Sequence, residues 1–141
     1  MDPILKREII LDNYQNPKNK GLVNDNNYIT IKSNNESCID DLDIQYKIEK
    51  GIITDIHFDG EACAISTSAT SIMIRMLIGK TIEEAKIILE NYENMINEKE
   101  YDKHLLEELN VYDEIYLQPN RKKCAFLPFT SLKKIIEQTK I

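Results

Sequence analysis

The sequence of 141 residues has no tryptophan and no long apolar stretch. A helix that crosses a bilayer needs roughly 18 consecutive apolar residues, and the sequence contains no such run. Charged Asp2, Glu8 and Asp12 interrupt the N-terminal segment where a secretory signal would be apolar. A glycine-rich phosphate loop and a Ser–His–Asp pattern are also missing. These absences predict a cytoplasmic protein without a membrane span, without a glycine-rich phosphate-binding loop and without a Ser–His–Asp catalytic site.

An excess of basic residues is missing as well, since 18 Lys and Arg stand against 24 Asp and Glu and the formal net charge is −6. This balance disfavours nucleic acid and an anionic membrane surface as partners, because both attract basic faces. Three cysteines are an odd number, and without an export signal no disulfide is expected. The length predicts one domain over residues 1–141. Frequent Ile, Lys and Asn are typical of a bacterial protein from an AT-rich genome.

Strand patterns occupy much of the first half of the chain. The predicted strands are residues 28–32, 41–49 and 52–58. In the second of them apolar and charged residues alternate, so one face is apolar and the other polar. Lys50-Gly51 is a short turn that makes the last two strands an antiparallel hairpin. The polar face indicates that one side of the sheet is exposed to solvent.

Helical patterns occupy most of the remaining chain. The predicted helices are residues 4–14, 63–78, 81–97 and a last one from near Cys124 to about Gln138, with short helical turns over 101–118. Asn16-Pro17 ends the first helix, and Thr81 with Glu84 forms a capping box for the third. Pro128 favours a start of the last helix close to it. The elements together predict an α+β fold, a three-stranded antiparallel sheet packed on one face by helices.

The densest chemistry lies in three cysteines and one aspartate. Cys38 and Asp40 precede the second strand, and Cys63 and Cys124 each stand where a predicted helix begins. Helix N-termini favour the thiolate form of a cysteine, and thiolates bind metals. Three thiols and one carboxylate can therefore form a four-ligand site for a soft or borderline metal.

A second interpretation stays open on the residues alone. A buried cysteine is commonly a small apolar side chain without chemistry, and the 24 and 60 residues that lie between successive cysteines match no zinc-finger spacing. Two histidines, His57 and His104, stand in polar surroundings that predict solvated side chains. The hydroxyl residues between 66 and 71 are expected to let the buried helix pack closely.

Four segments resemble one family in order along the chain. They are Tyr14 to Gly21, Asn35 to Asp40, Phe58 to Ser66 and Arg121 to Cys124. Their cysteine, glycine and Asn-Pro patterns are similar to those of the U-type iron–sulfur assembly family, which comprises IscU, the NifU N-terminal domain and SufU. The chain is identified as a SufU-type member, because Lys123 stands where IscU-type scaffolds have a histidine and residues 99–120 resemble the SufU insertion. The resemblance implies the SufE/NifU-like fold.

The resemblance also implies a metal site and a function. Its ligands fall on Cys38, Asp40, Cys63 and Cys124, with Zn²⁺ bound, or alternatively iron or a transient [2Fe–2S] cluster. Lys123 and Arg121 are expected to supply positive charge beside the site. The implied function is that of a zinc-dependent sulfurtransferase. In this role Cys38 accepts persulfide sulfur from a SufS-type cysteine desulfurase and passes it to downstream Suf-type assembly proteins, so the chain is an acceptor rather than an enzyme that turns over on its own.

Two alternatives accompany this interpretation. The same ligands suit a scaffold that assembles a [2Fe–2S] cluster, because tetrahedral thiolate sites bind either zinc or iron–sulfur clusters. A structural zinc domain that docks a partner is the other alternative. The chain also departs from the family pattern, since Ile39 replaces a glycine and Glu36 a proline. Isoleucine restricts the backbone more than glycine does, so the change is expected to affect the mobility of the loop.

Overall fold

The computed structural model describes residues 1–34 and 41–139, and it has the predicted α+β fold. The strands are β1 (Ile29–Asn34), β2 (Asp41–Glu49) and β3 (Ile52–Glu61). The helices are α1 (Pro3–Gln15), α2 (Ala64–Leu77), α3 (Ile82–Ile96), α4 (Lys103–Leu106) and α5 (Pro119–Thr139), with short 3-10 helices η1 (Glu107–Tyr112) and η2 (Ile115–Leu117). Within the described ranges no helix is both long and apolar enough to cross a membrane.

The sheet is antiparallel in the order β1-β2-β3, so β2 is its central strand. Lys50 and Gly51 join β2 to β3 with positive φ angles of 52° and 75°, as a tight hairpin turn requires. The register shifts next to Lys47, and Thr54 is the extra residue of a bulge. The bulge explains why β3 does not alternate regularly, since Ile53 and Ile56 are both buried.

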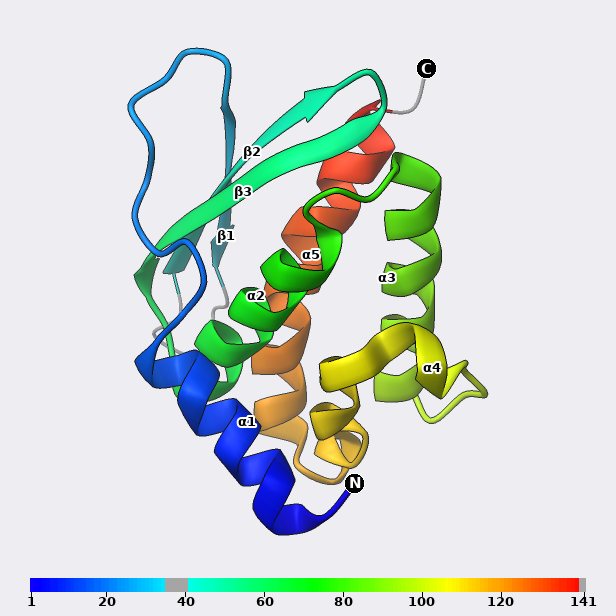
Figure 1. The fold of residues 1–141 in the computed structure, drawn as a ribbon. Helices are drawn as coiled ribbons and strands as arrows, with labels where there is room; N and C mark the ends of the chain where they lie inside the picture. Colours follow the sequence, from blue (N-terminus) through cyan, green and yellow to red (C-terminus); the bar gives the residue numbers. More distant parts are fainter. Residues whose placement is uncertain (35–40, 140–141) are drawn as a thin grey trace.

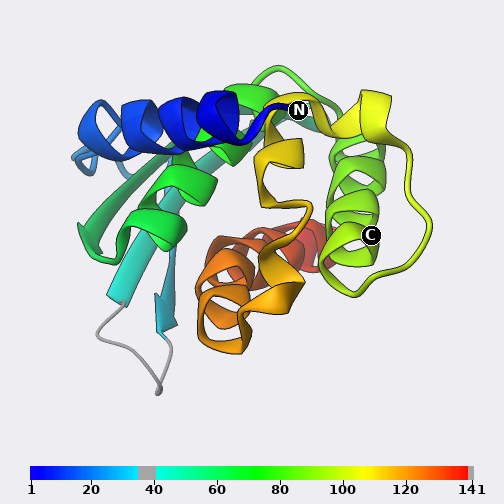
Figure 2. The same cartoon turned by 90° about the horizontal axis from the view of Figure 1, so that it is seen from below.

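The helices form a layer on one face of the sheet, as Figures 1 and 2 show. Helices α2 and α5 contact the strands directly, α1 lies beside α2, and α3 packs against α5. The inner face of the sheet contributes Leu42, Ile44 and Phe58, which are fully buried. Helix α2 is buried along nearly its whole length, because Arg75 is its one charged residue. This confirms the predicted buried helix.

The prediction that the polar face of the sheet is exposed is wrong at its centre. The segment between α1 and β1 crosses this face, and the side-chain amide of Gln45 donates to the carbonyl of Val23 and accepts from its N–H, both at 2.7 Å. Backbone hydrogen bonds between Gly21 and Phe58 and between Phe58 and Asn19 hold the segment along β3. Strand alternation identifies the two faces, but it does not show which part of the chain covers them.

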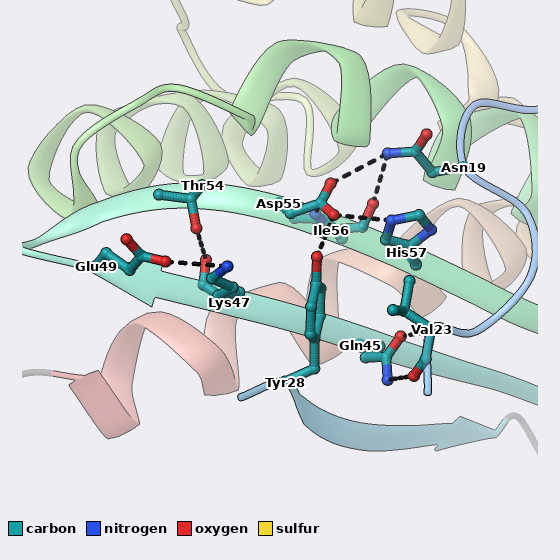
Figure 3. Close-up of polar contacts among 10 residues, drawn as sticks. All are labelled: Asn19, Val23, Tyr28, Gln45, Lys47, Glu49, Thr54, Asp55, Ile56 and His57. Carbon is teal, nitrogen blue, oxygen red and sulfur yellow. Dashed lines mark hydrogen bonds and ion pairs between the residues drawn. The ribbon is translucent and has the colours of Figure 1, made fainter. Parts of the chain in front are cut away.

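Asp55 lies at the centre of a hydrogen-bonded cluster on this covered face (Figure 3). Its carboxylate accepts from the hydroxyl of Tyr28, from Nε2 of His57 at 2.8 Å and from the amide of Asn19 at 3.4 Å. Burial by itself would raise the pKa of Asp55, but the hydrogen bonds from Tyr28 and His57 outweigh it and the pKa lies below its ordinary value. The hydrogen bond to Asp55 is also the main cause that raises the pKa of Tyr28 to about 12.

His57 is half-buried and bonded to Asp55, which corrects the prediction of a solvated side chain. His104 is exposed, as expected.

We expect Asp55→Asn to flatten the dependence of stability on acid pH. Because the folded-state pKa of Asp55 is depressed, its stabilisation is complete above the unfolded-state pKa of about 3.9 and is lost as the pH falls through the folded-state value. Asp55→Asn should lower the free energy of unfolding by about 1 kcal/mol at pH 7 and reduce its decline between about pH 5 and pH 3. Urea unfolding at several pH values measures both. Exposed Asp59 of the same strand supplies the control variant Asp59→Asn, and equal slopes for the two variants would contradict the expectation.

Candidate metal centre

Cys63 lies where β3 passes into α2, and it is the N-cap of that helix as predicted. Its sulfur accepts from the backbone N–H of Ser66 at 3.5 Å, which satisfies one of the N–H groups that a helix start leaves without a helical partner. Gly60, with φ of +126°, lies in β3 one residue before its end and pairs with Leu42. The thiol is half-buried and is held by the first turn of α2.

Cys124 is buried inside α5 and does not begin it, which corrects the prediction of a helix start at this residue. Helix α5 begins at Pro119, whose ring fixes φ at a value suited to the first helical position. The carbonyl of Gln118 accepts the first helical hydrogen bond, from Lys122 N at 2.9 Å. Cys124 therefore stands in the second turn, with the backbone of a continuous helix on both sides of it.

Pro128 also lies inside α5, four residues after Cys124. A proline cannot donate the backbone hydrogen bond that residue 128 of a regular helix gives to the carbonyl of residue 124. The hydroxyl of Ser66 donates to this carbonyl of Cys124 at 2.9 Å. The thiol of Cys63 in turn lies 3.6 Å from the same hydroxyl oxygen, to which it can donate. Ser66, which is fully buried, thus touches both cysteines.

Both cysteines line one cavity of about 940 Å³ between α1, the start of α2, the turns of residues 111–118 and the start of α5. Three basic residues line it too: Lys6, Arg7 and Arg121. Nζ of Lys6 lies 2.6 Å from Asp113 Oδ1, and this hydrogen bond is the main cause that raises the pKa of Lys6. Lys123, the other basic residue expected beside the site, is exposed.

The remaining two predicted ligands, Cys38 and Asp40, lie outside the described residues. The strands on either side of them are described, however. Asn34 at the end of β1 pairs with Asp41 at the start of β2, and Asp41 pairs with Glu61, two residues before Cys63. Asn34 and Asp41, which flank the segment with Cys38 and Asp40, therefore lie at the same end of the sheet as Glu61, the last residue of β3.

The described part of the site fits zinc by the chemistry of its donors. Cys63 and Cys124 supply two thiol groups from two packed helices, and Zn²⁺ prefers thiolate ligands in tetrahedral sites. Cys38 and Asp40 would complete three sulfur donors and one oxygen donor. The sequence did not indicate the role of Ser66 or of Pro128. A proline within a predicted helix, four residues after a candidate ligand, was the available signal.

The chain is similar to known proteins over most of its length. Residues 5–134 match the family model described as the NifU-like N terminal domain. The chain is 36% identical over 131 residues to the zinc-dependent sulfurtransferase SufU of Bacillus subtilis strain 168, which covers 92% of this chain and 88% of that protein. It is 30% identical over 131 residues to the iron–sulfur cluster assembly scaffold protein IscU of Thermotoga maritima, covering 93% of this chain and 92% of the relative.

A solved structure shows the same fold. The crystal structure of a putative iron–sulfur cluster assembly scaffold protein for the SUF system from Fervidobacterium islandicum AW-1 superposes with a TM-score of 0.81 at 32% sequence identity. The match covers 90% of this chain and 93% of the other. The α+β fold predicted from the strand and helix patterns is confirmed by this likeness.

Proposed function

Because the chain belongs to the family of NifU-like N-terminal domains, which takes part in iron–sulfur cluster assembly, we propose that it is a zinc-dependent sulfurtransferase of the SufU type. In this proposal residues 1–141 act as one domain that binds Zn²⁺ through Cys38, Asp40, Cys63 and Cys124. Its partners are a SufS-type cysteine desulfurase, which supplies the sulfur, and downstream Suf-type assembly proteins, which receive it.

One observation carries the proposal: Cys63 and Cys124, on two different helices, line the same cavity. Of the two strand ends that flank Cys38 and Asp40, Asp41 pairs with Glu61, near the end of β3 that leads into Cys63, and Asn34 pairs with Asp41. The SufU relative, whose name states zinc dependence, is 36% identical to the chain over nearly its whole length. Bound zinc would hold three thiolates and one carboxylate together in one closed site.

The charge of the cavity supports this ligand set. Three thiolates and one carboxylate around a divalent ion leave a net negative site, which positive side chains nearby would stabilise. Arg121 lines the cavity with the cysteines and Arg7 of α1 lines it too, whereas Lys6 is already paired with Asp113 and Glu114. Lys123 precedes Cys124 at the position where IscU-type scaffolds have a histidine, which favours sulfur transfer over cluster assembly.

The proposed reaction moves one sulfur atom. The Cys38 thiolate attacks the terminal sulfur of a persulfide on the desulfurase, and a sulfur–sulfur bond forms at Cys38. The sulfur–sulfur bond of the desulfurase persulfide breaks, and the desulfurase cysteine leaves as a thiolate. The persulfide hydrogen travels with the transferred sulfur, so no oxidant or reductant is needed. Cys63 is held at the start of α2 and Cys124 within α5, and both serve to fix the site.

The runner-up is a scaffold that assembles a [2Fe–2S] cluster on the same ligands, and the IscU relative at 30% identity supports it. Thiolate ligands suit either occupant. A structural zinc domain that docks a partner is the second alternative. Metal removal separates it from the others, because a structural zinc site is expected to unfold when its metal is taken away.

We expect anaerobically purified protein to contain stoichiometric zinc and to be colourless, since zinc has no visible absorption in a thiolate site. Elemental analysis with an optical spectrum measures this. Cys63→Ser should lose most of the zinc, because the loss of a direct ligand costs more than the roughly 10- to 100-fold typical of outer partners. Iron together with a coloured chromophore in the isolated protein would favour the scaffold, and a chelator-treated protein that unfolds completely by circular dichroism would favour the structural domain.

A further inference from the structure

We propose that Ser66 is a positioning residue that sets Cys63 and Cys124 relative to one another, and that Pro128 is what makes this role necessary. The inference rests on the proposed function in so far as both cysteines are taken as metal ligands. It concerns how the two thiol groups are placed before any metal binds.

Pro128 cannot supply the helical N–H to the carbonyl of Cys124, and a proline ring inside a helix also crowds the carbonyl four residues before it. The affected carbonyl belongs to the predicted ligand itself. A buried carbonyl needs a donor, because a polar group without one costs free energy comparable to a lost hydrogen bond. The Ser66 hydroxyl supplies a donor from α2 at 2.9 Å.

The backbone N–H of Ser66 donates to the sulfur of Cys63, and its hydroxyl oxygen lies 3.6 Å from the same sulfur. The side chain of Thr70 donates to the carbonyl of Ser66 at 2.7 Å, one turn further along α2. Ser66 is fully buried, so solvent does not compete with these bonds. One residue therefore connects the sulfur of one predicted ligand to the backbone of the other.

Other buried serines of α2 make interhelical bonds that do not involve a cysteine. Ser71 donates to the side chain of Asn13 on α1 at 2.7 Å, and it is as fully buried as Ser66. Ser68 bonds to the hydroxyl of Tyr112. A general role in holding helices together would make these serines equivalent. The positioning role predicts that Ser66 alone among them affects metal binding.

The test compares zinc affinity in Ser66→Ala and Ser71→Ala, measured by competition with a chromophoric chelator. Loss of a partner that orients a ligand typically weakens metal affinity by about 10- to 100-fold, and we expect about tenfold for Ser66→Ala. Ser71→Ala should lower the melting temperature but leave the affinity within about twofold, because its bond does not reach a ligand. The visible ligand-field bands of bound Co²⁺ should shift in Ser66→Ala and remain unchanged in Ser71→Ala.

Pro128→Ala provides the second arm, and it keeps the test decisive if Ser66→Ala folds poorly. Alanine restores the N–H that donates to the Cys124 carbonyl, so the hydroxyl of Ser66 becomes less important. In the Pro128→Ala background, Ser66→Ala should fold and should weaken zinc binding by less than about threefold, against about tenfold in the natural background.

The outcomes separate the two proposals. If the unaltered protein binds no zinc, the proposed function fails and this inference fails with it. If it binds zinc but Ser66→Ala and Ser71→Ala change the affinity equally, or Ser66→Ala leaves it within about twofold, the positioning role alone is overturned. An equal effect of Ser66→Ala with and without Pro128 would overturn the part assigned to the proline.

Discussion

Cys38→Ser is expected to abolish the stimulation of a cysteine desulfurase by this protein and to leave no persulfide on the chain. Only a thiolate attacks a persulfide, and a serine hydroxyl does not replace it at neutral pH. Cys63 is fixed as the N-cap of α2 and Cys124 is buried inside α5, so neither thiol can move without disturbing a helix. In the sequence Cys38 falls between the residues of β1 and those of β2, outside both helices, so we expect it to be the cysteine that meets a partner.

The measurement is a desulfurase turnover assay with the unaltered protein and each Cys→Ser variant, followed by mass spectrometry of the persulfide. Zinc content and circular dichroism are determined for every variant, because Cys63→Ser and Cys124→Ser should lose activity together with the metal. Ser37→Ala, next to Cys38, is the matched control and should keep the stimulation. A persulfide mapped to Cys63 or Cys124, or stimulation that survives Cys38→Ser, would refute the assignment.

Gly60→Ala adds one methyl group to the chain. We expect it to lower the free energy of unfolding more than a methyl group added anywhere else near the site. Gly60 has φ of +126°, a conformation that residues with a side chain rarely adopt. A Cβ at this position would also collide with the carbonyl oxygen of Asp41 and lie 3.2 Å from the Cα of Leu42. These are backbone atoms of the paired strand β2, so they cannot rotate away. We expect a loss of about 3 kcal/mol or more in the free energy of unfolding.

The control is Gly21→Ala, where φ is +115° but an added Cβ meets no atom of the described residues within 4 Å. It should cost only about 1–2 kcal/mol, from the backbone conformation alone. Urea unfolding of both variants isolates the contribution of the collision. Because Asp41 directly follows the segment with Cys38 and Asp40, Gly60→Ala should also weaken zinc binding. Equal losses of stability for the two variants would show that β2 and β3 can separate locally at little cost.

Local sequence signals predicted most of the secondary structure. Thr81 and Glu84 form the expected capping box, with both reciprocal hydrogen bonds present. The Lys50-Gly51 turn joins the second and third strands, and the second strand has the predicted bounds. Each of these features depends on residues within about four positions of one another, so the sequence contains all the information that decides them.

The start of the last helix shows where local signals were not sufficient. Pro128 suggested that the helix begins near it, because proline is common in the first turn. The helix instead begins at Pro119, five residues before the predicted start near Cys124, and continues through Pro128. The Ser66 hydroxyl, 58 residues away in sequence, donates to the carbonyl of Cys124 that the proline cannot serve. A donor on another helix is invisible to any rule based on neighbouring residues.

The sequence by itself therefore determined most of the elements, the fold class and which four residues are candidate ligands. Only the tertiary structure decided that Cys63 and Cys124 share a cavity, that Ser66 links them, and that the segment before β1 covers the polar face of the sheet at Gln45. The physical reason is the range of the interactions. Capping and strand alternation arise within one turn or a few residues, whereas contacts between α2 and α5 depend on how the whole chain packs around one core.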